Sequence, residues 1–186
     1  MTKKTIILAV ITFVFLLLHH MAAKAQNYIS NSVKTSFFSS TPIEDIKAAS
    51  SKTAAILISK TGEFAFQIPI KSFEFEKRLM QEHFNENYIE SDRYPTASFK
   101  GTINPNINWQ KDGEYNTVAK GTLTVHGVSK SRNIPAKILI KNGSATIMAD
   151  FEVACADHNI KIPSLVFTKI AKVIQVKVNG TLTPKP

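Results

Sequence analysis

The segment from Ser131 to Ala154 restricts the fold more than any other part of the chain. It holds two runs in which apolar and polar residues alternate, joined by Asn142-Gly143. Such alternation predicts strands with one dry and one wet face, and Asn-Gly favours a two-residue type I′ turn. We therefore predict a β-hairpin with these residues on its buried face: Ile134, Ala136, Ile138 and Ile140, then Ala145, Ile147, Ala149, Phe151 and Val153.

The pattern recurs along the chain after residue 25. Short runs rich in Val, Ile, Thr and Phe are separated by Gly, Asn, Pro or Asp, which is typical of antiparallel sheet. We predict a mainly β domain of about eight strands, as a sandwich or as a closed barrel, which has no exposed edges. Further inward positions are predicted at Phe64, Phe66, Ile68, Ile70, Ala97, Phe99, Gly101, Ile103, Ala119, Gly121, Leu123, Val125, Ile174, Val176, Val178 and Leu182.

One or two short helices are predicted between the strands. Thr41, Pro42 and Glu44 match an N-cap, a first helical position and a capping box, which predicts a helix from Thr41 to about Ser50. A second helix is predicted from residue 72 to about residue 84, close to a barrel mouth and buried on two sides. Its two apolar faces would carry Phe73, Met80 and Phe84 on one side and Phe75 and Leu79 on the other.

Residues 1–25 match a secretory signal peptide. A short basic start precedes an apolar run that stops at His19, and Ala23 and Ala25 supply the small residues of a cleavage site. The run is short for a membrane-spanning helix, so no stable membrane insertion is expected. Residues 26–186 then form one domain of ordinary size, which we expect to be periplasmic or secreted.

The charge distribution indicates whether nucleic acid is a partner, and the cysteine content indicates whether a disulfide can form. The formal charge of +9 falls to +6 without Lys3, Lys4 and Lys24 of the signal peptide, and the remaining lysines are scattered along outward positions of the strands, which favours a solvated surface over a nucleic-acid site. Cys155 is the only cysteine, so no internal disulfide can form and the fold depends on its core. The sequence leaves open whether the chain forms a homodimer.

Three segments, in order, resemble the YceI-like family of exported bacterial proteins. They are residues 61–103, residues 121–138 with the pattern Gly-x-Leu-Thr-x-His-Gly-Val, and residues 160–182. The resemblance implies a lipocalin-like barrel whose lumen accepts a polyisoprenoid-like or fatty-acyl chain, and it does not imply an enzyme or a cofactor. The chain departs from the family at His158-Asn159, where an aromatic residue and a glycine are expected.

The expected ligand is therefore a long apolar lipid in the lumen, held for sequestration or transport. An eight-stranded barrel is only just wide enough for this, so the pattern alone leaves an open lumen and a filled core equally possible. The resemblance favours an open lumen. The predicted contacts are Phe64, Phe66, Phe99, Leu123, Ala136, Ile138, Ile147, Ala149, Phe151 and Val176, with Tyr88, Arg93 and Tyr94 as candidates at the mouth.

Two alternatives to a carrier are a filled-barrel structural or stress-related protein and an enzyme acting on such a lipid. An inward carboxylate or histidine beside a cavity would favour the enzyme. His126 has outward parity and precedes Gly127, so we interpret it as a turn residue. We expect His126→Ala to cost at most about 1 kcal/mol, the scale of one hydrogen bond.

Cys155, Asp157 and His158 are the one cluster with metal-ligand residue types. They lack the second pair of ligands that a structural zinc site uses, so we predict no metal.

The signal-peptide interpretation predicts that the mature chain begins at Gln26 and is recovered in the soluble periplasmic fraction. Intact mass of the exported protein measures this directly. A retained Met1, with the protein in the membrane pellet, would contradict both the cleavage site and the localisation.

Overall fold

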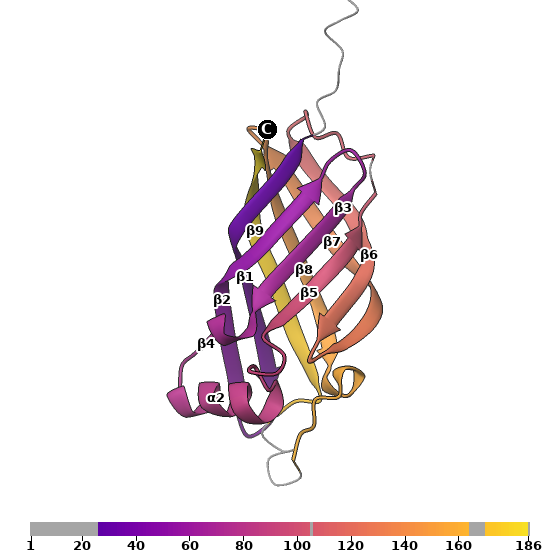
Figure 1. The fold of residues 1–186 in the computed structure, drawn as a ribbon. Coiled ribbons are helices and arrows are strands. Elements are labelled where there is room, and N and C mark those ends of the chain that lie inside the picture. Colours follow the sequence, from indigo (N-terminus) through magenta and orange to yellow (C-terminus); the bar gives the residue numbers. More distant parts are fainter. Residues whose placement is uncertain (1–25, 105, 164–169, 186) are drawn as a thin grey trace, which may run out of the picture.

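The computed structural model describes residues 26–104, 106–163 and 170–185, so the predicted signal peptide lies outside the described residues. Eight antiparallel strands close into a barrel, as predicted, with one helix at one end (Figure 1). The order around the barrel is β1, β9, β8, β7, β6, β5, β3 and β2, and β1 pairs with β2 to close it. The bounds are β1 Asn27–Ser40, β2 Asp45–Ile58, β3 Glu63–Pro69, β5 Thr96–Thr102, β6 Gly113–Val125, β7 Val128–Lys141, β8 Ser144–Ala154 and β9 Val173–Lys185.

The predicted hairpin is formed by β7 and β8. Asn142 and Gly143 both have positive φ, 50° and 74°, as a type I′ turn requires. Ala136 lies opposite Ala149, and Ile138 lies opposite Ile147. The alternation in the sequence therefore fixes both the turn and the register of this pair.

The predicted helix from Thr41 to Ser50 is wrong. Thr41 to Glu44 form the turn between β1 and β2, and the next residues belong to β2. The Thr41 hydroxyl accepts hydrogen bonds from the Ile43 and Glu44 amides at 3.3 and 3.1 Å, so the capping pattern stabilises a turn. Pairing with β1, with Ala48 opposite Phe37, keeps the following residues extended.

The second helix lies beside one end of the barrel, but its predicted start is wrong. Helix α2 spans Arg78–His83 and continues as a π-helical turn over Phe84–Tyr88. The residues before it form a 3₁₀ turn at Ile70–Ser72 and the short strand β4 (Glu74–Phe75), which pairs with β2. The phenylalanines pack on one another instead of on two helix faces, with ring centroids 5.1 to 5.9 Å apart among Phe37, Phe73, Phe75 and Phe84.

Two clusters of buried residues occupy the two ends of the barrel. The cluster opposite α2 is tightly buried: Tyr28 packs against Trp109 with ring centroids 5.1 Å apart, and Ile140 and Leu182 are at most 1% exposed. The cluster beside α2 includes Ile68, Ile70, Phe73 and Ile89. In the described part of the chain, no helix has the length and hydropathy to span a membrane.

Two of the small inward residues allow close approach of strands. Gly101 of β5 lies opposite Gly121 of β6, and a Cβ on either would clash with the backbone of the other strand, at Lys120 and Lys100 respectively. These glycines therefore serve the curvature of the barrel.

The close approach predicts that Gly121→Ala destabilises the protein by about 2 kcal/mol, the scale of an overpacked interior. Gly113→Ala is the matched control, because the nearest atoms to its Cβ would lie at an ordinary 3.6 Å, and its effect should stay within about 0.5 kcal/mol. Urea unfolding measures both. Equal stabilities of the two variants would contradict the packing argument.

Candidate functional site

The half of the barrel beside α2 encloses a cavity of about 590 Å³. All eight barrel strands contribute to its wall, because alternate residues of each strand point inward. Most of the lining side chains are apolar. Thr35 and Thr53 are exceptions deep in the wall, and their hydroxyls hydrogen-bond to each other at 2.8 Å. This pairing lets the wall present a largely apolar surface.

Eight of the ten predicted contact residues line this cavity: Phe66, Phe99, Leu123, Ala136, Ile147, Ala149, Phe151 and Val176. The other two, Phe64 and Ile138, are not lining residues. They are 6% and 1% exposed and belong to the cluster that fills the opposite end. The alternation predicts which face a residue occupies, but it carries no information about its depth along the barrel.

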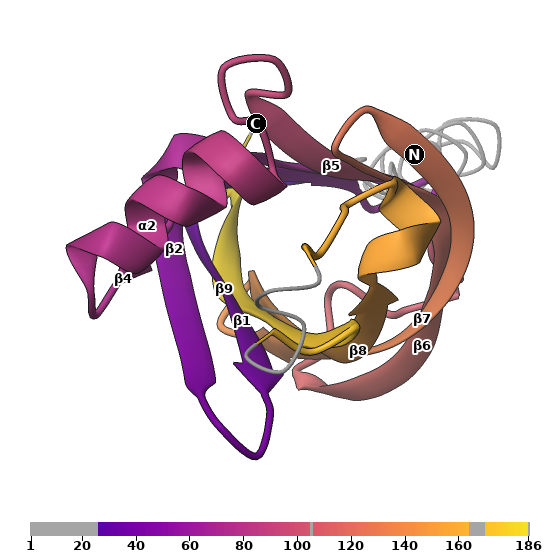
Figure 2. The same cartoon turned by 90° about the horizontal axis from the view of Figure 1, so that it is seen from below.

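The cavity opens at the α2 end of the barrel. Residues 160–163, which follow the 3₁₀ turn Cys155–His158, run across this end, and α2 lies beside it (Figure 2). Ile160, Ile162 and the helix residue Met80 line the opening. We call this opening the mouth.

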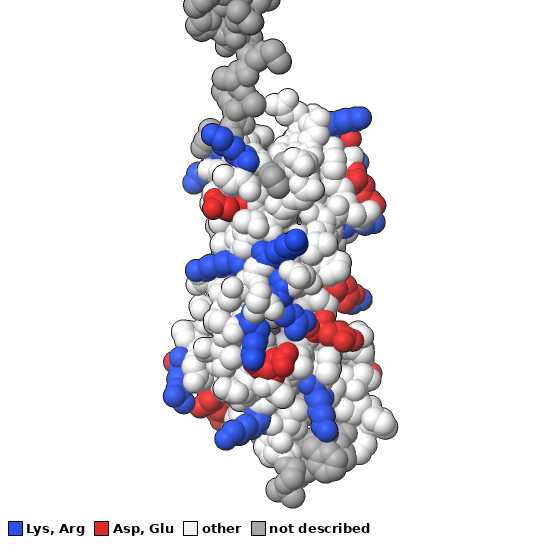
Figure 3. Space-filling model, turned by 90° about the vertical axis from the view of Figure 1, so that its right-hand side faces the viewer, with Lys and Arg blue, Asp and Glu red and all other residues white. Residues whose placement is uncertain are grey.

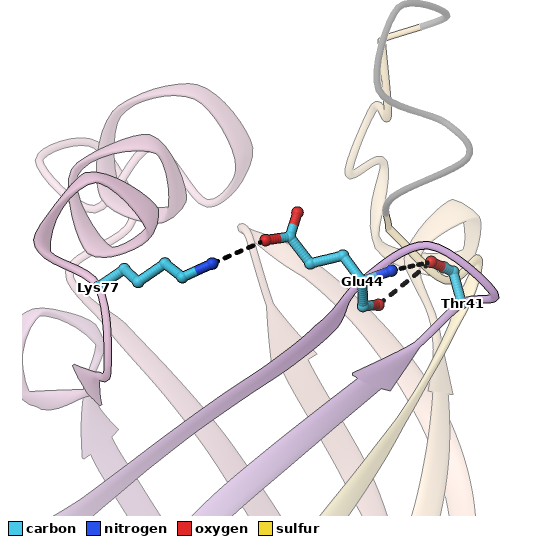
Figure 4. A network of polar contacts seen from close by, with 3 residues as sticks. All are labelled: Thr41, Glu44 and Lys77. Atoms are coloured by element: carbon cyan, nitrogen blue, oxygen red, sulfur yellow. Dashed lines mark hydrogen bonds and ion pairs between the residues drawn. The ribbon is translucent and has the colours of Figure 1, made fainter.

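A charged pair joins the two sides of the mouth. The Lys77 ammonium lies 3.2 Å from the Glu44 carboxylate, and both residues line the cavity (Figure 4). Thr41 holds the Glu44 backbone through its hydroxyl, as described above. Glu44 and Lys77 are not among the predicted mouth residues, because they lie 33 positions apart and the capping pattern places Glu44 in a helix.

Of the three predicted mouth residues, Tyr88 lines the cavity. Burial raises the pKa of its phenol, so the hydroxyl stays protonated and can donate a hydrogen bond. Arg93 and Tyr94 do not line the cavity. The Arg93 guanidinium lies 5.2 Å from the Tyr94 ring, which in turn packs edge-on against His126 with centroids 4.4 Å apart.

His126 is a turn residue, as predicted, but it is buried and not outward. His126 and Gly127 have φ of 50° and 72° and form the two-residue turn between β6 and β7. Nδ1 lies 3.0 Å from the His158 carbonyl oxygen and Nε2 lies 2.7 Å from a Glu90 carboxylate oxygen. Since a carbonyl only accepts, Nδ1 carries a hydrogen. His126 therefore ties together three segments that border the mouth.

The departure at His158-Asn159 fits this arrangement. Asn159 has φ of 55°, and asparagine tolerates the left-handed region better than other non-glycine residues. His158 is fully buried, and its Nδ1 lies 3.0 Å from the Val128 carbonyl. The pair thus provides the turn geometry without the expected glycine.

The cluster of Cys155, Asp157 and His158 divides among separate roles. Cys155 is a buried free cysteine that lines the cavity, and burial raises the pKa of its thiol. Asp157 lies 3.8 Å from Arg132. Within the described ranges, no three His, Cys, Asp or Glu residues are grouped as metal ligands would be.

The exterior of the barrel carries charges of both signs. On the face shown in Figure 3, Lys and Arg are spread along the barrel with Asp and Glu among them. Several are paired across strands, such as Lys137 with Glu114 at 2.6 Å. This distribution is that of a solvated surface.

Fold and cavity together define a single antiparallel barrel with an apolar lumen. The model of the YceI-like domain matches residues 19–182, and the chain belongs to this family. No curated protein matches the chain significantly.

Solved structures share the fold at low sequence identity. A polyisoprenoid binding domain from Saccharophagus degradans is 14% identical with a TM-score of 0.72, over 87% of this chain and 100% of that one. BcnA from Burkholderia cenocepacia is 19% identical with a TM-score of 0.67, over 81% and 96%. A YceI protein from Campylobacter jejuni is 14% identical with a TM-score of 0.55, over 73% and 81%.

The contacts of His126 revise the expected cost of its removal. His126→Ala removes both hydrogen bonds of the ring and leaves the buried His158 carbonyl without its donor and Glu90 with Arg93 as its charged partner, so it should cost about 2 kcal/mol instead of at most about 1. His83→Ala, at an exposed position of α2, is the control and should stay within about 0.5 kcal/mol. Denaturant unfolding compares the two, and a cost no larger for His126→Ala than for the control would contradict this role.

Proposed function

We propose that the protein binds one long apolar lipid chain in its lumen, for sequestration or transport, without covalent chemistry. The observation that carries this proposal is the apolar cavity of about 590 Å³, which eight strands enclose and which opens at one end. Pockets of this size are typical of small-molecule sites. The polyisoprenoid binding domain from Saccharophagus degradans, which shares the fold, gives further support.

Burial of the chain alone supplies enough free energy for binding. About fifteen to twenty methylenes at roughly 0.8 kcal/mol each contribute on the order of 12 to 16 kcal/mol. Association and ordering offset several kcal/mol of this. The remainder is consistent with micromolar or tighter binding and requires no charged contact inside the lumen.

The head group would then lie at the mouth, where the lining residues include a charged pair and a phenol. Lys77 and Glu44 offer one donor and one acceptor, and Tyr88 offers a hydroxyl. Arg93 and Tyr94 lie outside the lining, so we no longer assign them to the head group.

The lining argues for binding over catalysis. Among the described lining residues the titratable groups are Glu44, Lys77, His83, Tyr88 and Cys155. Glu44 and His83 meet the criterion set above for an enzyme, a carboxylate or histidine beside a cavity, but no hydrogen bond joins them in the described part of the chain. The carboxylate of Glu44 pairs with Lys77 instead. The His126–Glu90 pair lies outside the lining, where it connects loops.

The signal-peptide pattern supports export to the periplasm or beyond, where such a carrier would meet membrane lipids. Each chain encloses its own cavity, so the proposal requires no second subunit. The sequence leaves homodimer formation open, and sedimentation of the mature protein tests it.

Filling the cavity should abolish lipid uptake. Ala149→Phe places a ring in the lumen while the barrel stays folded, so uptake of a fluorescent long-chain lipid should fall at least tenfold. Lys137→Ala, which removes one outer ion pair, is the control and should bind like wild type. A folded Ala149→Phe protein that takes up the lipid as well as wild type would exclude the lumen as the site and favour the filled-barrel alternative.

A further inference from the structure

The cavity stops part-way along the barrel. Phe66 and Phe99 line it and also pack against the buried cluster of the opposite end. Phe64 lies 5.9 Å from the Phe66 ring and 5.0 Å from the Phe99 ring, between centroids, yet it lines no part of the cavity. With 6% exposure, Phe64 is therefore the buried ring directly beneath the lining rings. We call it the floor.

The strand register explains why one aromatic ring can close the lumen at this level. Phe64 lies opposite Gly101, which lies opposite Gly121, so these three neighbouring positions contribute a single side chain. The glycines cannot carry a Cβ because β5 and β6 approach too closely. An aromatic residue beside such glycines is a recurrent way to fill the space they leave.

A second layer of aromatic side chains lies in the same closed end. Tyr28 is 0% exposed and packs on Trp109, and its hydroxyl donates to the Trp109 carbonyl at 3.5 Å. Among the described residues, these contacts stand in the path of a chain that enters at the mouth and would leave at the other end of the barrel.

The volume above the floor limits the chain. At about 30 Å³ for each non-hydrogen atom, taken from the liquid volume of water, 590 Å³ holds about 20 atoms. We propose that Phe64 is a specificity-determining residue that limits the enclosed lipid to about 20 carbons, so that any longer tail stays outside the mouth. This inference rests on the proposed function and adds to it a limit on the length of the enclosed lipid chain.

A competition among fatty alcohols of different chain lengths tests whether Phe64 limits the length of the enclosed chain. The lipid-free protein is offered an equimolar pool of straight-chain fatty alcohols of about 12 to about 28 carbons as cyclodextrin complexes, which brackets the capacity of about 20 atoms. Bound alcohols are extracted and identified by mass spectrometry. Each methylene left in water should lower retention roughly fourfold relative to an apolar reservoir, so wild type should show a cut-off close to 20 carbons.

Two variants should move the cut-off in opposite directions. Phe64→Ala removes six ring carbons from the floor and should raise it by about six carbons, since interiors are uniformly dense. Ala119→Leu should lower it by about three carbons, because Ala119 lines the cavity and also belongs to the closed-end cluster. Phe38→Ala is the control, because Phe38 lies next to Lys47 in a groove separate from the lumen, and its cut-off should equal that of wild type.

The outcomes separate this inference from the proposed function. Two results would contradict the role of Phe64 and leave lipid binding intact. One is retention of lipids without a cut-off. The other is the same cut-off in wild type, Phe64→Ala and Ala119→Leu. If Phe64→Ala does not fold, an unshifted cut-off in Ala119→Leu is sufficient to overturn it. Failure of wild type to retain any alcohol would contradict the proposed function, and the floor with it.

Discussion

Closure of the sheet is the constraint on which the rest of the structure depends. Because β1 pairs with both β9 and β2, each of the eight barrel strands has two neighbours and the sheet closes on itself. A closed barrel of eight strands has a nearly fixed width. The content of the lumen is therefore set by side-chain size along its length: Tyr28 and Phe64 fill one end, whereas Ala136 and Ala149 leave room at the other.

This division shows what the sequence could predict and what it could not. The period of two along a strand assigns Ile147, Ala149 and Phe151 to the interior, and they line the cavity. The same period assigns Phe64 to the interior but says nothing of its depth, which depends on strand stagger and on the closure. The local capping pattern at Thr41 predicts a helix start, yet pairing with β1 decides the conformation of the residues that follow.

The polar contacts at the mouth could not be predicted for a related reason, since they join residues far apart in the chain. His126 and Glu90 are separated by 36 positions, and Glu44 and Lys77 by 33. Neither pair has a local signature. In both pairs the contacting residues lie in turns or loops outside the strands, so we interpret the two pairs as the contacts that shape the mouth of an otherwise apolar cavity.

The central claim is that the lumen holds one apolar chain, and native mass spectrometry of the protein purified from its own host tests it most directly. The account predicts a mass above that of the polypeptide by one lipid, which is released on denaturation and identified as a long-chain compound. Protein that carries its polypeptide mass alone and takes up no lipid when exposed to host membranes would contradict the claim.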